Sequence, residues 1–153
     1  MRFAAKEDIN APVAAVYAAL TEFETFERLA MAKGAEITRS GGPGAGTVWD
    51  IGFKLRGRKR QVRATLSAAE APGGLRFVGA SPNLDLVLAV SLVALAQQKT
   101  RMNVDFEVTP RTLAARIVLQ SARLGKSRLT RKFQKRVHQA AQLVAARATA
   151  GRA

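Results

Sequence analysis

The sequence contains no cysteine and a single histidine, His138. The missing cysteine excludes disulfides, thiolate nucleophiles and cysteine-ligated zinc, and it fits a reducing compartment. One histidine leaves little from which to build a metal centre. We therefore expect a cytoplasmic protein that holds no metal and no cofactor.

Long apolar runs are also missing. The longest nearly unbroken one, residues 84–96, is 13 residues long and contains Asp85, whereas a membrane-spanning helix needs about 20 apolar residues. Near the start of the chain, Glu7 and Asp8 stand where a signal peptide would require an apolar stretch. The sequence predicts neither a membrane span nor secretion.

Acidic residues are absent after Glu107, although eleven Lys or Arg residues follow it. The whole chain has 25 Lys and Arg against 11 Asp and Glu, a net charge of +14. Residues 1–107 hold 14 of the bases and all 11 acids, which leaves a net charge of +3 there. A helix that needs charge only for solubility usually mixes both signs, so this segment indicates an anionic partner.

The 153 residues are enough for one hydrophobic core, and we predict a single domain over residues 1–150. Apolar residues that alternate with polar ones have the period of a β-strand. Strands are predicted at residues 2–9, 35–39, 47–55, 59–66, 75–80, 84–95 and 100–108. Turn-forming residues separate them, so neighbouring strands should pair antiparallel.

Helices are predicted in two places. Apolar residues at three- and four-residue spacing indicate two short helices between Pro12 and Gly34, with Asn10 and Thr21 as capping residues. After Pro110 the same spacing continues to Arg147 and predicts one long helix. Gly125 lies inside it and either allows a close approach or produces a kink. The elements predict an α+β fold with helices on one side of the sheet.

Three segments of the sequence resemble the motifs of a known superfamily. They are the segment Asp8-Ile9-Asn10-Ala11-Pro12-Val13-Ala14-Ala15-Val16-Tyr17, Trp49 after a glycine-rich turn, and Lys99-Thr100-Arg101 at the start of the last strand. Together with the element order they resemble the START-like superfamily, also called SRPBCC or Bet v 1-like, which includes polyketide cyclase/dehydrase-like proteins. The resemblance implies a helix-grip fold: a curved, seven-stranded antiparallel sheet around a long C-terminal helix, two short helices after the first strand, and an apolar cavity.

The cavity should be lined by the inward residues of the strands and by the helix face that meets them. We predict that its walls include Trp49, Ile51, Phe53, Phe77, Met102, Val104, Phe106, Leu124 and Phe133. The alternative for each residue is that it fills a closed core. Taken together they favour a site for an apolar small molecule such as a lipid, an isoprenoid or a polyketide-like compound.

A run of bases in the C-terminal helix is the candidate surface for an anionic partner. The basic surface consists of Arg123, Lys126, Arg128, Arg131, Lys132, Lys135 and Arg136. A second basic cluster surrounds the turn near Gly57. An anionic membrane is the favoured partner, because nucleic-acid binding would require aromatic residues among the bases and Phe133 stands alone there. The oligomeric state is left open.

Catalysis has little support in the sequence. His138 lies in a basic stretch, and Asp50, Asp105 and Glu107 fall on the outer faces of strands, where ion pairs with neighbouring bases explain them. Asp85 interrupts the most apolar strand; a position at an edge or near a turn explains it, and a polar anchor in the pocket is the alternative. We predict no catalytic residues and a binding or carrier protein. The alternatives are a cyclase or hydrolase-like enzyme that uses the same cavity, and an RNA-contacting basic protein.

Overall fold

The structure is a computed structural model that describes residues 1–150; Arg152, one of the bases counted above, lies outside the described residues. The elements are β1 (Arg2–Ile9), α1 (Val13–Leu20), α2 (Phe23–Ala32), β2 (Glu36–Ser40), β3 (Val48–Leu55), β4 (Arg58–Glu70), β5 (Gly74–Ala80), β6 (Leu84–Ala96), β7 (Lys99–Pro110), α3 (Leu113–Ala122), the 3-10 turn η1 (Arg123–Gly125) and α4 (Lys126–Ala150).

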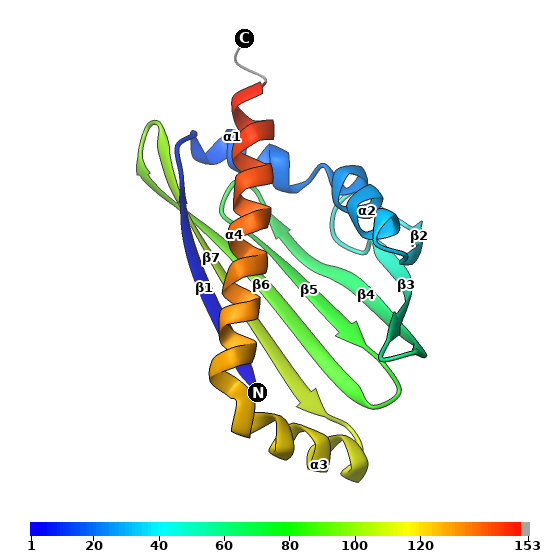
Figure 1. Cartoon of the computed structure of the whole chain (residues 1–153). Coiled ribbons are helices and arrows are strands. Elements are labelled where there is room, and N and C mark those ends of the chain that lie inside the picture. Colours follow the sequence, from blue (N-terminus) through cyan, green and yellow to red (C-terminus); the bar gives the residue numbers. More distant parts are fainter. Residues whose placement is uncertain (151–153) are drawn as a thin grey trace.

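The strands form one seven-stranded antiparallel sheet in the order β1-β7-β6-β5-β4-β3-β2. Irregularities in register between Leu66 and Ala68 and between Ala94 and Ala96 interrupt the ladders, and such bulges bend and twist a sheet. The curved sheet partly surrounds α4, and the helices lie on its concave side (Figure 1). The structure confirms the predicted α+β helix-grip fold, including the two short helices after the first strand.

The segment that carries the family resemblance has a physical role. Ala11 and Thr100 are fully buried, and the Thr100 hydroxyl donates a hydrogen bond of 2.8 Å to the Ala11 carbonyl. This bond ties the start of β7 to the turn between β1 and α1. Pro12, with φ −62°, is the residue before α1, so the predicted cap at Asn10 is wrong by two positions. Proline has the φ angle that a helix start requires.

The long helix α4 lies along β1 and also packs against α1. Its buried residues Val137, Ala141, Val144 and Ala148 recur every three or four positions, which places them on one face. Towards its C-terminal end, Arg147 donates a hydrogen bond to Thr25 and pairs with Glu22 at 3.1 Å. These contacts place α4 over one side of the sheet and leave the central strands free of it.

The prediction of one continuous helix from residue 112 to residue 147 is wrong. The chain changes direction sharply at η1, so α3 crosses the end of the molecule while α4 runs along the sheet (Figure 1). Of the two roles considered for Gly125, the kink is the one observed. No neighbouring atom lies within 4 Å of the position a Cβ would take there, so close approach is not the reason for the glycine.

The apolar strand β6 is covered on one face by the rest of the chain. Its inward residues Val90 and Leu92 are buried, whereas Val93 and Leu95 near its end are exposed. This follows because the helices lie on a single side of the sheet (Figure 1). No helix among residues 1–150 is long and apolar enough to cross a membrane.

Candidate ligand cavity

A cavity of about 570 Å³ lies between the concave face of the sheet, α2 and α4. Its position follows from the fold, because α4 covers the β1 side, α2 covers the β2 side, and the central strands form the floor (Figure 1). The described residues that line it are Leu20, Phe23, Phe26, Glu27, Ala30, Ile37, Trp49, Ile51, Val62, Ala64, Leu75, Phe77, Gly79, Leu86, Leu88, Val90, Met102, Val104, Phe106, Phe133, Arg136, Val137 and Ala140.

The structure brings seven of the nine predicted cavity residues to this wall and leaves two outside it. The seven are Trp49, Ile51, Phe77, Met102, Val104, Phe106 and Phe133. Phe53 lies two residues beyond Ile51 towards the β3–β4 turn and pairs with Arg60, past the last part of β3 that lines the cavity. Leu124 is 94% exposed, because the bend at η1 carries it away from the sheet.

Two groups of aromatic rings belong to opposite sides of the cavity. Under α2, the rings of Phe23 and Trp49 meet edge to face with centroids 5.0 Å apart, and Phe77 lies 5.7 Å from Trp49. Under α4, the rings of Phe106 and Phe133 are 6.1 Å apart. Aromatic pairs at these distances stabilise each other beyond the area they bury, so both ends of the cavity have well-supported walls.

Glu27 on α2 is the charged residue that sequence reasoning missed. Its side chain is 13% exposed. Oε2 accepts a hydrogen bond of 2.8 Å from Trp49 Nε1 and lies 3.3 Å from Nε of Arg39 on β2. The signal was present, because Glu27 falls four residues after Phe23 and three before Ala30, on the apolar face of the helix. The carboxylate joins α2 to β2 and β3 at the edge of the cavity.

Arg136 is the other charged residue among those that line the cavity. It is exposed at the same time, so the cavity reaches the surface beside α4. Arg136 also belongs to the basic surface. All seven members of the basic surface are exposed, and within residues 1–150 none of them forms an ion pair.

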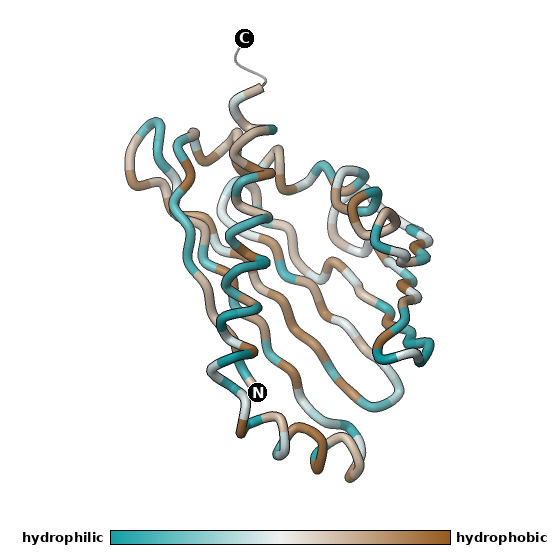
Figure 2. The backbone as a smooth tube through the Cα atoms, viewed as in Figure 1, coloured by the Kyte–Doolittle hydropathy of each residue, from teal (hydrophilic) through white to brown (hydrophobic). Residues whose placement is uncertain are grey.

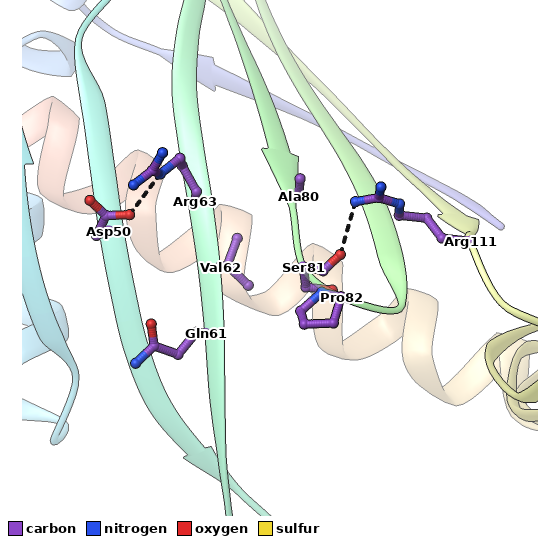
Figure 3. A pocket seen from close by; sticks show the side chains of 8 residues that line it. All are labelled: Asp50, Gln61, Val62, Arg63, Ala80, Ser81, Pro82 and Arg111. Atoms are coloured by element: carbon purple, nitrogen blue, oxygen red, sulfur yellow. Dashed lines mark hydrogen bonds and ion pairs between the residues drawn. The ribbon is translucent and has the colours of Figure 1, made fainter.

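A second depression, of about 340 Å³, lies on the outer side of the sheet around Asp50, Arg63 and Arg111 (Figure 3). Arg63 Nε donates a hydrogen bond of 2.9 Å to Asp50 across the β3–β4 pair, which raises the pKa of Arg63. Arg111 donates to the Ser81 carbonyl at 3.2 Å and lies 3.8 Å from Asp85. The charges here are paired between neighbouring elements, as predicted for Asp50, and no reactive group stands apart from them among the residues drawn.

Of the remaining candidates for acid–base chemistry, Asp105 and His138 have structural partners, whereas Glu107 is exposed and forms no ion pair within residues 1–150, so the ion pair predicted for it is wrong. Asp105 on β7 lies 3.3 Å from Arg2 on β1. His138 on α4 bonds through Nδ1 to Glu7 on β1, which holds the helix against the sheet. In the described part of the chain, no three His, Asp or Glu side chains gather as metal ligands would.

These features define a helix-grip protein with an apolar cavity. The chain belongs to the family described as polyketide cyclase / dehydrase and lipid transport, whose model matches residues 1–145, within the START-like superfamily that its motifs predicted. None of the curated proteins matches the chain.

Solved structures share the fold at low sequence identity. TTHA0849 from Thermus thermophilus has a TM-score of 0.71 and 15% identity, with 100% of both chains covered. The Zhui aromatase/cyclase from Streptomyces sp. R1128 has a TM-score of 0.65 and 12% identity, over 97% of this chain and 93% of that one. A START superfamily protein from Mycobacterium smegmatis has a TM-score of 0.56 and 15% identity, over 90% and 97%. At these identities the likeness establishes the fold.

Proposed function

We propose that residues 1–150 act as one domain that binds and carries a largely apolar small molecule, of the lipid, isoprenoid or polyketide-like class, in the cavity between the sheet and α4. The cavity of about 570 Å³ carries this proposal, since small-molecule sites typically measure 300–1,000 Å³ and have mostly apolar walls. Protein interiors otherwise pack with few voids larger than a water molecule.

The basic surface has a separate role in this proposal, namely contact with an anionic partner. Its seven exposed side chains have no acidic partner within residues 1–150. Unpaired charges of one sign attract the opposite charge over a Debye length. We also propose a cytoplasmic location, which the cysteine-free composition fits.

An enzyme that uses the same cavity is the second candidate, and Glu27 is the observation that favours it. A carboxylate in an apolar wall can accept a proton from a bound substrate. Against this, Oε2 of Glu27 is already engaged by Trp49 and Arg39, and Arg136 lies on a different element. A carrier function therefore accounts for the residues that line the cavity better than an enzymatic function does.

Titration of the fluorescence of Trp49 tests the carrier proposal. Trp49 is the only tryptophan of the chain and lies buried in the cavity wall, so an occupant should change its emission. Farnesol, palmitic acid and 2-methylnaphthalene serve as probes of different shape. We expect saturable binding of at least one of them.

A matched pair of variants on α4 shows where a probe binds. Ala140 lines the cavity, whereas Ala146 on the same helix is exposed. Ala140→Phe should weaken binding by about tenfold or more, because it removes volume that a ligand occupies and overlap with a ligand is costly. Ala146→Phe should bind as the wild type does. Equal binding by both variants would show that the probes sit elsewhere and would contradict the proposal.

A further inference from the structure

The bend between α3 and α4 exposes large apolar side chains. The elbow ridge consists of Leu113, Ile117, Val118 and Leu124, which are 73%, 56%, 65% and 94% exposed. Leu113 and Ile117 lie one helical turn apart on the same face of α3, and Leu124 follows in η1. Figure 2 shows apolar positions along α3 at the end of the molecule. Large apolar residues gathered in one exposed region usually mark an interaction site.

The way in which α3 packs makes this exposure unusual. Its buried residue is the small Ala115, and the helix contacts β7. Leu113, Ile117 and Val118 face solvent instead. A helix that only closed the end of the sheet would bury its large apolar side chains. The amphipathic pattern of α3 is therefore directed outward.

Bases flank the elbow ridge on both sides of the bend. Arg116 lies on α3, Arg123 in η1, and Lys126 and Arg128 in the first turn of α4. All four are exposed and none forms an ion pair within residues 1–150. The three after α3 belong to the basic surface, so the ridge and the basic surface are continuous along the chain.

We propose that this elbow docks the protein on an anionic lipid bilayer: the elbow ridge enters the boundary between headgroups and acyl chains, and the basic surface contacts the headgroups. Helices that bind a membrane interface combine an apolar face with Lys and Arg and few acids. Polybasic segments are attracted to the negative surface of anionic lipid, and each added base strengthens the attraction. The inference rests on the proposed role of the basic surface and adds both the partner and the apolar element that inserts.

A second copy of the chain fits the elbow less well. A two-fold interface brings the same patch of both copies together. The bases Arg116, Arg123, Lys126 and Arg128 of one copy would then lie against the same group of bases of the other, with no acid after Glu107 among them. Like charges that meet in this way repel. RNA would use the bases but would leave the elbow ridge without a function, because the ridge holds no aromatic ring on which a base could stack.

Sedimentation with lipid vesicles tests the proposal on the ligand-free protein. Wild-type protein is mixed with phosphatidylcholine vesicles that contain or lack phosphatidylserine, at low and high salt. We expect binding to the anionic vesicles, reduced by salt, and little binding to neutral ones. Ile117→Ser with Leu124→Ser should lower the partition coefficient by about tenfold or more, because two apolar side chains no longer enter the interface. Both positions are exposed, so the fold should be unaffected.

Two matched variants serve as controls. Val93→Ser with Leu95→Ser makes the same kind of change at exposed apolar positions of β6 and should leave vesicle binding unchanged. Arg123→Glu with Lys126→Glu changes the net charge as much as Lys54→Glu with Lys59→Glu, a pair of opposed residues in the β3–β4 hairpin. The first pair should weaken binding to anionic vesicles more than the second.

The possible results separate this inference from the proposals it builds on. Wild-type binding by the Ile117→Ser/Leu124→Ser variant, still sensitive to salt, would overturn insertion of the elbow ridge and keep the role of the basic surface. Binding to polyuridylate RNA without binding to anionic vesicles would overturn the choice of partner. A wild-type dimer that this variant converts to a monomer in analytical ultracentrifugation would make the ridge a subunit interface and overturn docking. Ligand titration through Trp49 is independent of all three.

Discussion

Replacement of Glu27 by leucine tests the polar contact at the edge of the cavity. In the wild type, the carboxylate accepts a hydrogen bond of 2.8 Å from Trp49 Nε1, and Trp49 is 5% exposed. Leucine offers no acceptor, so the indole N–H would stay buried without a partner. Glu27→Leu should therefore lower the free energy of unfolding, and it should do so mainly through Trp49.

The size of the expected loss in the free energy of unfolding follows from the two partners of the Glu27 carboxylate. A buried donor left without an acceptor costs about 1–3 kcal/mol. The pair with Arg39, whose side chain is 36% exposed, adds at most about 1 kcal/mol because solvent screens it. We expect a total loss of about 2–3 kcal/mol. Glu27→Gln keeps an oxygen acceptor and should cost about 1 kcal/mol or less.

Urea denaturation followed by circular dichroism measures these differences in a double-mutant cycle. In a Trp49→Phe background the donor is gone, so Glu27→Leu should cost about 1–2 kcal/mol less than it does in the wild type. Glu24→Leu, at an exposed neighbouring position 3.7 Å from Arg39, should change stability by about 0.5 kcal/mol or less. An unchanged cost of Glu27→Leu in the Trp49→Phe background would refute the reasoning.

Three further substitutions have expected effects on stability. Hydrogen bonds from Arg101 at 2.8 and 3.2 Å lower the pKa of Asp8; this pair therefore stabilises the fold above about pH 4 and stops doing so as the pH falls through the lowered pKa. Asp8→Asn should lower the urea midpoint at neutral pH but not in strong acid, and a constant difference would contradict this. Thr100→Val leaves the buried Ala11 carbonyl without its donor and should cost about 1–3 kcal/mol in urea denaturation; a neutral effect would contradict it. Gly125→Ala meets no neighbouring atom and should gain about 0.5–1 kcal/mol; a loss in the same assay would show strain at η1.

Most of the fold was predictable because its elements have strong periodic signals. Strands such as β3 and β7 alternate with period two, and glycine and proline mark the turns between them. The bend at η1 was not predictable with the same certainty. Apolar residues recur from Leu113 to Val144 without an obvious break, and Gly125 was compatible with either a kink or a close contact. The direction of a helix axis depends on tertiary packing, which periodicity does not report.

The sequence predicted which face of each strand lines the cavity, but not how far along the strand the cavity extends. Trp49 and Ile51 lie on the inward face of β3 and line the cavity. Phe53 shares that face but lies too far along the strand to reach the cavity. How far a cavity extends along a strand depends on where α2 and α4 cover the sheet. The sequence analysis missed Glu27 because it selected cavity residues by apolar spacing alone, and a carboxylate on the same helix face does not contribute to that pattern. Its partners Arg39 and Trp49 lie on other elements, and the sequence does not show that they meet.

Native mass spectrometry of the protein purified from cells under mild conditions tests most directly whether the cavity carries a small molecule. The account predicts a bound species released by gentle activation, and its loss in Ala140→Phe but not in Ala146→Phe. Spectra that remain ligand-free after incubation with a cellular lipid extract would contradict a carrier function for this cavity.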